Sequence, residues 1–227
     1  MRGGYMMTAR KNKKELCVMN IWDLCPFLPN KHRVSVALHA LTEKIRGVDF
    51  TMPDRMYNRH RNDGAMYYAS SKNMLDQIFS LVDREKYSRF LDVGSGKGFV
   101  LAQAKQYGFS QVGGVEYDEA LCEICRHNLE RLGITQGIQV YQGDACTFTG
   151  YGDYDVFYFY NPFKAEMMDQ VIRRIVAQCP GREIMLIYYR PRYTEAIEGC
   201  GFFRKEHVLY DKETNYEVFI YSGKIPE

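Results

Sequence analysis

Three glycines at alternate positions are the residues whose spacing most directly indicates ligand chemistry in this sequence. Gly94, Gly96 and Gly98 follow Asp92, at the end of a short apolar run, and a helical pattern begins immediately after them. Glycine has no Cβ, so it adopts positive φ and lets a bulky ligand approach the backbone. A helix N-terminus adds unpaired N–H groups and a positive dipole end. Residues 89–100 therefore predict a strand, a ligand-binding turn and a helix start.

The spacing of these glycines distinguishes three classes of ligand. The dinucleotide fingerprint G-x-G-x-x-G requires glycine or alanine at position 99, where this chain has Phe99. The phosphate-binding G-x-x-x-x-G-K-[ST] loop requires glycine at position 91 and a hydroxyl at 98, where the chain has Leu91 and Gly98. The pattern that fits is acidic-x-Gly-x-Gly-x-Gly. With it, the sequence resembles the class I S-adenosylmethionine-dependent methyltransferases.

Three later runs agree with this resemblance. Residues 111–116 read as a second strand that ends in Glu116, 22 residues beyond Gly94. A carboxylate there can accept hydrogen bonds from both ribose hydroxyls of an adenosine. Residues 138–145 read as a third strand that ends in Gly-Asp-Ala, and residues 155–163 as a fourth that ends in Asn-Pro-Phe. The order and spacing of the four runs together carry the prediction, since a lone glycine pattern is weak.

The resemblance implies roles for individual residues. The turn residues would cradle the methionyl part of the cofactor, and Asp92 would act through the turn and the cofactor ammonium. Glu116 would bind the ribose, Asp144 with Ala145 would bind the adenine, and Tyr117 would stack beside the adenine or ribose. The predicted cofactor-binding residues are Asp92, Gly94, Ser95, Gly96, Gly98, Glu116, Tyr117, Asp144, Ala145 and Asn161.

The run Asn161-Pro162-Phe163 supplies the candidate catalytic residues at the end of the fourth strand. It resembles the Asn/Asp-Pro-Pro-Tyr/Phe motif of amino-group methyltransferases, whose side-chain amide and backbone carbonyl accept hydrogen bonds from the target amine. One proline of that motif is missing here, which argues against nucleobase amines but leaves a nitrogen acceptor favoured. The alternative is a turn that ends the strand and has no catalytic role.

Residues 57–71 combine polar and aromatic side chains without the period of a core element. In class I methyltransferases the chain before the first strand commonly folds over the methionine end of the cofactor, which makes Tyr68 a further catalytic candidate. A Tyr-x-Ser/Thr stretch followed by a helix is also similar to the non-SET histone lysine methyltransferases. That likeness covers short motifs only, because that family has two asparagines before its phenylalanine where this chain has Asn161 and Pro162.

Elements that would position these residues alternate along the chain. Helical patterns cover residues 72–82, 99–107, 118–132 and 164–178, and a fifth apolar strand covers 183–189. Alternating strands and helices of these lengths predict parallel crossover units. Residues 202–210 and 216–222 instead read as a hairpin, which an ordinary NAD-binding Rossmann domain would not be expected to have. We expect an α/β, doubly wound, seven-stranded sheet with helices on both faces; the resemblance implies strand order 3-2-1-4-5-7-6.

The net charge of +2 conceals an asymmetry between the two parts of the chain. Residues 1–62 hold 12 Lys and Arg against 5 Asp and Glu, and the remainder is mildly acidic. We therefore expect a basic, partly helical N-terminal extension, residues 1–70, and a methyltransferase domain, residues 71–227. The extension includes an apolar stripe that a helix closing at Gly47 would present. It could cap the active site, pack against the sheet or contact phosphates, although a solvated basic surface is the simpler interpretation.

Composition argues against several other classes of protein. The seven cysteines are scattered, as expected in a reducing cytoplasm, and Cys122-x-x-Cys125 lies within a helical pattern with no second pair, so we expect no metal site. No run of 18 apolar residues is present, and the start lacks a signal-peptide pattern, which favours a cytoplasmic protein without membrane contact.

We therefore predict an enzyme that uses S-adenosyl-L-methionine to methylate a nitrogen or oxygen on a protein side chain or a small molecule. Two alternatives remain open at this point. The basic extension could serve an RNA or DNA methyltransferase, for which nucleic-acid binding would depend steeply on salt. The chain could also bind the cofactor without turnover. The acceptor itself is not specified by the sequence.

Overall fold

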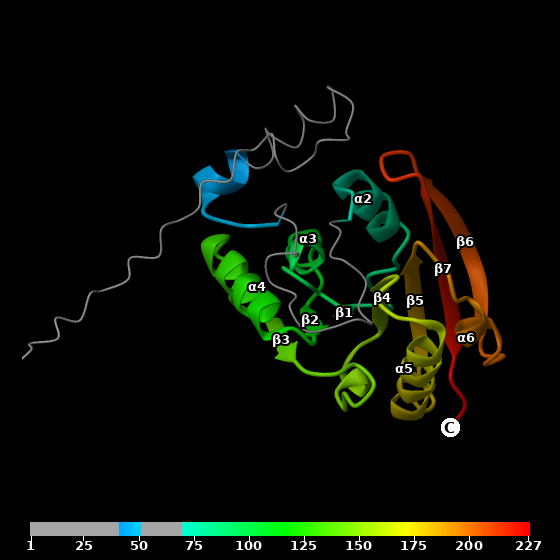
Figure 1. The fold of residues 1–227 in the computed structure, drawn as a ribbon. Coiled ribbons are helices and arrows are strands. Elements are labelled where there is room, and N and C mark those ends of the chain that lie inside the picture. Colours follow the sequence, from blue (N-terminus) through cyan, green and yellow to red (C-terminus); the bar gives the residue numbers. More distant parts are fainter. Residues whose placement is uncertain (1–40, 51–69) are drawn as a thin grey trace, which may run out of the picture. The chain divides into compact units, whose positions relative to one another are not determined.

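The computed structural model describes residues 41–50 and 70–227, and all of them fall within one compact unit (Figure 1). Seven strands form one sheet in the order β3-β2-β1-β4-β5-β7-β6, as predicted. Strands β1 to β5 are parallel, whereas β7 runs antiparallel to β5, and β6 antiparallel to β7. The strands are β1 (Arg89–Val93), β2 (Gln111–Glu116), β3 (Ile138–Gln142), β4 (Val156–Tyr160), β5 (Glu183–Tyr189), β6 (Phe203–Asp211) and β7 (Tyr216–Lys224).

Helices cover both faces of this sheet (Figure 1). On one face lie α2 (Lys72–Ser80), α3 (Phe99–Tyr107) and α4 (Glu119–Arg131). On the other lie η3 (Tyr151–Asp153), α5 (Ala165–Gln178) and α6 (Glu195–Glu198). Side-chain caps begin two of them: Ser71 accepts a hydrogen bond from the Met74 N–H of α2, and Asp118 accepts one from the Leu121 N–H of α4. None of the described helices is long and apolar enough to cross a lipid bilayer.

Successive side chains of the central strands point to opposite faces of the sheet, so each strand contributes to both halves of the core. In β1, Phe90 packs into the cluster under α2 and α3, and Leu91 packs into the cluster under α5. Both side chains are fully buried, and each such burial stabilises the fold by about 1.5 to 3 kcal/mol. The same alternation directs the Asp92 side chain toward the α2 and α3 face of the sheet, beside its register partners Gly114 and Tyr158.

The bounds of β2, β5 and α3 agree with the prediction, and β1 lies within residues 89–100 as expected, whereas two strands are shorter than expected. Strand β3 ends at Gln142, because the Asp144 carboxylate then accepts a hydrogen bond from the Cys146 N–H in a turn. Strand β4 ends at Tyr160, because Asn161 takes a positive φ of 40°. The sequence analysis did not predict η3 or α6, which are too short to show a period.

The predicted N-terminal extension is described only in part. Residues 41–46 are helical and Gly47 has a φ of 70°, so the helix closes where predicted. Leu41 and Ile45, two members of the predicted apolar stripe, are exposed. Tyr68 and the rest of residues 1–40 and 51–69 lie outside the described residues. The division at residue 70 remains a prediction.

Candidate cofactor and acceptor site

The three predicted glycines form a turn with left-handed backbone between β1 and α3. Their φ angles are 91° at Gly94, 51° at Gly96 and 83° at Gly98. A Cβ on Gly94 would lie 2.9 Å from the Cβ of Pro162, so this turn touches the turn that follows β4. A Cβ on Gly98 would collide with the Sγ of Cys125 on α4. Side chains are therefore excluded on both sides of the turn.

Glu116, the last residue of β2, holds the glycine turn in place. One carboxylate oxygen, Oε2, accepts a hydrogen bond from the Gly96 N–H at 3.0 Å, and Oε1 accepts one from the Asp118 N–H at 2.9 Å. Burial raises the pKa of this carboxyl, and the backbone N–H groups offset only part of that rise. Each oxygen retains a second lone pair that a pair of ribose hydroxyls could use.

Asp92 lies beneath the same turn and is almost inaccessible, with 3% of its surface exposed. Burial raises the pKa of its carboxyl well above the usual range, and the negative charge of Glu116 raises it further. No described residue donates a hydrogen bond to the Asp92 carboxylate. A buried carboxyl to which no described residue donates a hydrogen bond favours a ligand that carries positive charge.

Two buried polar atoms beside the turn have no hydrogen-bond partner among the described residues: Ser95 Oγ and Asn161 Oδ1. Ser95 lies over β2, since a Cβ on Gly114 would fall 2.6 Å from its Oγ. Asn161 is 8% exposed and is one of few non-glycine residues with positive φ. Buried polar atoms are normally paired, so these two indicate places where a ligand would complete the hydrogen bonding.

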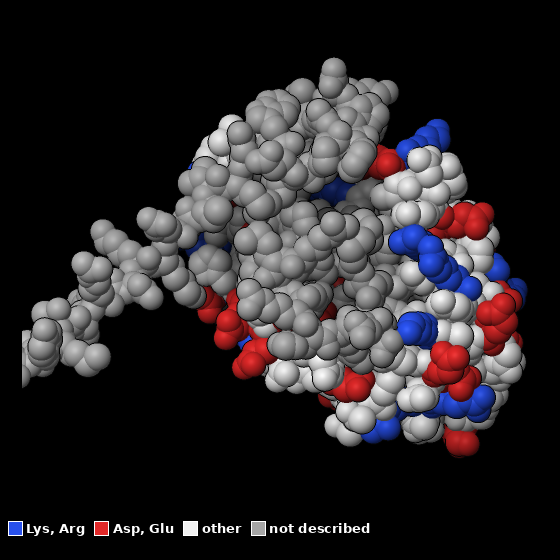
Figure 2. Space-filling model, in the orientation of Figure 1, with Lys and Arg blue, Asp and Glu red and all other residues white. Residues whose placement is uncertain are grey.

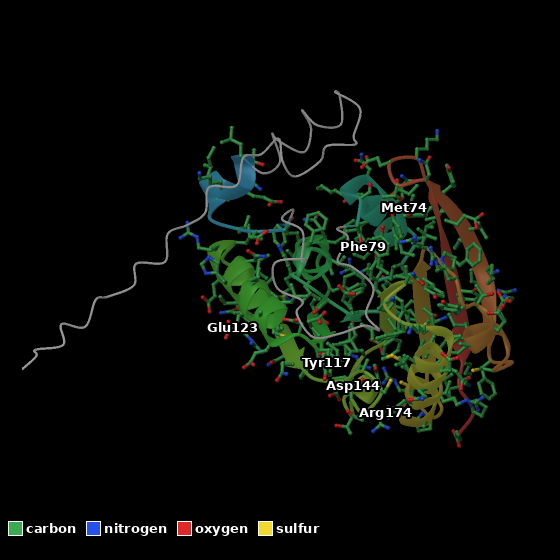
Figure 3. All side chains as sticks on the ribbon, viewed as in Figure 1. Met74, Phe79, Tyr117, Glu123, Asp144 and Arg174 are labelled. Carbon is green, nitrogen blue, oxygen red and sulfur yellow. The ribbon has the colours of Figure 1, made fainter. Side chains whose placement is uncertain are left out.

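The predicted adenine-binding residues lie at the ends of β2 and β3, which are adjacent and pair Glu116 with Gln142 (Figure 3). Tyr117 presents an exposed ring, with 54% of its surface accessible. The loop after β3 is fixed because the Tyr151 hydroxyl donates to the Ala145 carbonyl at 2.8 Å. Asp144 is half-buried at the start of that loop. An aromatic face and a carboxylate at one edge suit a nucleobase.

The residues that close β5 hold the C-terminal hairpin. The Tyr189 hydroxyl donates to the Asp211 carboxylate, and the Tyr188 hydroxyl accepts from the Arg192 N–H at 3.4 Å. The Arg190 guanidinium lies over the Tyr216 ring at 4.4 Å, with a φ of 54° at Arg190. Burial raises the pKa of Tyr189 most, and the hydrogen bond to Asp211 raises it further, so this phenol stays protonated as a donor.

The structure brings the predicted turn, Asp92, Glu116 and the run that begins at Asn161 to one edge of the sheet, at the carboxyl ends of its parallel strands. Ligands bind at this edge in open α/β sheets. The sequence analysis missed the bond between the Ser70 and Tyr158 hydroxyls at 2.7 Å, which ties the start of α2 to β4. No local pattern around Ser70 indicates so distant a partner.

Comparisons with known proteins agree with this geometry. Residues 90–180 match the family model described as a methyltransferase domain. A protein-L-isoaspartate O-methyltransferase from Thermotoga maritima is 33% identical over 100 residues, which are 43% of this chain and 32% of that protein. The chain thus spans about a third of the length of this relative.

Solved structures share the fold at low sequence identity. An RNA methyltransferase from Salinibacter ruber in complex with S-adenosyl-L-homocysteine has a TM-score of 0.55 and 19% identity, over 70% of this chain and 95% of that one. A mutant of MtNAS in complex with S-adenosylmethionine has a TM-score of 0.53 and 22% identity, over 68% and 61% of the two chains. The solved structures thus share the fold of this chain, and residues 90–180 match the methyltransferase domain family.

Proposed function

We propose that this chain transfers a methyl group from S-adenosylmethionine to a nitrogen atom of a protein side chain or small molecule. The observation that carries the proposal is the contact between the glycine turn and the turn after β4, which leaves the buried Asn161 Oδ1 unpaired beside the cofactor-binding edge. The matched methyltransferase domain supports the reaction class.

The residues at this edge fit the cofactor. Glu116 offers two carboxylate oxygens to the ribose hydroxyls, and it already holds the turn through the Gly96 N–H. Asp92 places a buried negative charge under the turn, where it attracts the cationic end of the ligand. When bound, S-adenosylmethionine supplies a methyl group on a positively charged sulfonium. The protein then has to align the acceptor and keep its lone pair available.

Asn161 is the residue that we assign to the acceptor. An amide oxygen accepts hydrogen bonds only, so it would orient an amine through an N–H while leaving the nitrogen lone pair free for the methyl group. Its positive φ of 40° costs roughly 1 to 3 kcal/mol, and such strain is typical of functional sites. Pro162 fixes the backbone after it and packs on Gly94.

The experiment is transfer of tritium-labelled methyl groups to separated protein, RNA and small-molecule fractions of a cell extract. Label in the protein or small-molecule fraction that resists mild alkali and is recovered as N-methylated amino acids or amines after acid hydrolysis would support nitrogen as the acceptor. Label lost in alkali would identify carboxyl methyl esters and contradict it, and label confined to RNA would contradict the proposed acceptor class. Transfer to no fraction, with S-adenosylmethionine still bound, would indicate a binding protein.

Asn161→Gly separates the role of the amide from that of the backbone, because glycine keeps a φ of 40° without strain. We expect kcat to fall about a hundredfold, as for a misplaced acceptor, with little change in cofactor affinity. Asn215→Gly is the matched control, since Asn215 also has positive φ, 59°, but lies in the β6–β7 hairpin. Unchanged kcat in Asn161→Gly would remove Asn161 from the catalytic residues.

The described residues on the face shown in Figure 2 do not favour the RNA and DNA alternative. On the face shown in Figure 2, their basic and acidic side chains are interspersed on the side where β6 lies. Ion pairs account for several of them, including Arg204 with Glu206 and Lys205 with Glu198 on β6 and α6. Most of the basic residues 1–62 lie outside the described part of the chain.

A further inference from the structure

Residues 47–50, which precede the matched methyltransferase domain, are attached to the cofactor-binding turn. Lys97 stands between two glycines of the turn, and its side chain is fully buried. Its Nζ lies 2.8 Å from the Asp49 Oδ1, and the Asp49 side chain is 28% exposed. A buried ammonium is strongly destabilising without a partner of opposite charge. The Asp49 carboxylate, from a segment distant in sequence, thus supplies opposite charge to the buried Lys97 ammonium.

Asn128 of α4 joins the same two residues through the backbone. Its Nδ2 donates to the Asp49 carbonyl at 2.9 Å and to the Lys97 carbonyl at 3.0 Å, and its Oδ1 accepts from the Asp49 N–H at 2.8 Å. Asn128 is completely buried, so water cannot replace these bonds. One buried amide thus fixes the backbone of the turn and the backbone of residue 49 relative to each other.

Further contacts hold residues 47–50 against the helices that flank the turn. The Phe50 ring meets the Phe99 ring of α3 edge-on, with centroids 5.4 Å apart. His127 of α4 lies 3.2 Å from the Gly47 carbonyl through its Nε2. Val48 and Phe50 are both buried. Polar and apolar contacts together keep this segment beside the start of α3.

We propose that Asp49 and Asn128 are positioning residues that set the geometry of the cofactor-binding turn. Glu116 of β2 holds the turn at the Gly96 N–H, and Asn128 of α4 holds it at the adjacent Lys97 carbonyl. Neither Asp49 nor Asn128 is assigned a contact with the cofactor; both act through the turn. The expected effect of Asp49 and Asn128 on cofactor affinity rests on the proposed function. Their expected effect on the conformation of residues 94–98 does not.

Two measurements test the proposal in Asp49→Asn and Asn128→Ala. The first is amide hydrogen exchange of residues 94–98 in the protein without added cofactor, because Gly94, Ser95, Gly96 and Gly98 all donate backbone hydrogen bonds there. We expect exchange about tenfold faster than in the wild type. The second is calorimetric titration with S-adenosylmethionine, for which we expect Kd to rise about tenfold.

A double variant tests whether the effect of Asp49→Asn comes from leaving the buried Lys97 ammonium without the Asp49 carboxylate. In Asp49→Asn/Lys97→Met no buried ammonium remains, so we expect Kd and exchange to return to within about threefold of the wild type. The matched control is Asp155→Asn, which removes a carboxylate from the ion pairs with Arg89 and Arg182 at the opposite edge of the sheet. It should lower the Tm without faster exchange specific to residues 94–98.

Exchange at residues 94–98 that is no faster in Asp49→Asn and Asn128→Ala than in Asp155→Asn would overturn the proposal. Asp49 is partly exposed, so Asp49→Asn continues the test if Asn128→Ala does not fold. A wild-type protein that fails to bind S-adenosylmethionine would contradict the proposed function, and the exchange experiment would still decide whether these residues position the turn.

Discussion

Replacing Asp92 with asparagine should stabilise the protein in the absence of cofactor and weaken cofactor binding. The Asp92 carboxyl is 3% exposed, and no described residue donates a hydrogen bond to it. Burial and the Glu116 charge raise its pKa well above the usual range. A carboxyl whose folded pKa is raised stabilises the protein below its unfolded pKa of about 3.9, and that contribution is lost as pH rises through the folded pKa.

The expected magnitude follows from the cost of a buried charged group without a partner. That cost is about 2 kcal/mol at a pH where the carboxylate is ionised. For a chain of this length it corresponds to a rise of about 4 to 8 °C in the Tm of Asp92→Asn. The gain should be largely lost near pH 4, where Asp92 is protonated in the folded state and about half protonated in the unfolded state.

Cofactor affinity should change in the opposite direction, because asparagine cannot neutralise a bound cation. We expect Kd for S-adenosylmethionine to rise between about tenfold and a hundredfold, or 1.4 to 2.7 kcal/mol. Thermal unfolding from pH 4 to 8 and calorimetric titration at pH 8 measure the two effects. A lower Tm at neutral pH, or an unchanged Kd, would refute this account of Asp92.

Three further predictions concern other residues of the fold. Glu116→Gln should raise Kd for S-adenosylmethionine at least tenfold in a calorimetric titration. The Gly96 and Asp118 N–H groups now both donate to the carboxylate, and in glutamine one of them would face an amide nitrogen that cannot accept. An equal Kd would contradict the role of Glu116. Gly98→Ala should lower the free energy of unfolding by about 2 kcal/mol in a urea titration, because its φ is 83° and the new Cβ would meet Cys125; an unchanged midpoint would contradict the turn geometry. Burial raises the pKa of Asp155, but the hydrogen bonds and charges of Arg89 and Arg182 together outweigh it, so the pKa is lowered overall. Asp155→Asn should therefore cost about 2 kcal/mol at pH 7, and the difference should vanish as pH falls below about 4; a constant difference in thermal unfolding would exclude this ion pair as its cause.

Much of the fold follows from local patterns in the sequence. The glycine turn and the bounds of β2 and β5 were predictable because β2 ends in an acidic residue and β5 is an almost wholly apolar run. The terminal hairpin indicated the change from parallel to antiparallel pairing, and the resemblance supplied the strand order. Glu116 was predicted to bind the ribose from its spacing after the glycine turn, and that role stays a prediction.

The contacts that assemble the site were not predictable in the same way. Lys97 reads as a surface residue in a loop, and nothing near it in sequence indicates a partner at Asp49 or an amide at Asn128. Pairings across such separations depend on how the helices pack, which periodicity does not specify. The predicted role of Tyr68 stays a prediction, because that residue lies outside the described part of the chain.

Calorimetric titration of the wild type and Glu116→Ala with S-adenosylmethionine, S-adenosylhomocysteine and NAD tests the central claim most directly. The account predicts micromolar binding of the first two ligands by the wild type, loss of most of that affinity in Glu116→Ala, and no binding of NAD. Binding of NAD by the wild type, or full affinity for S-adenosylmethionine in Glu116→Ala, would contradict it.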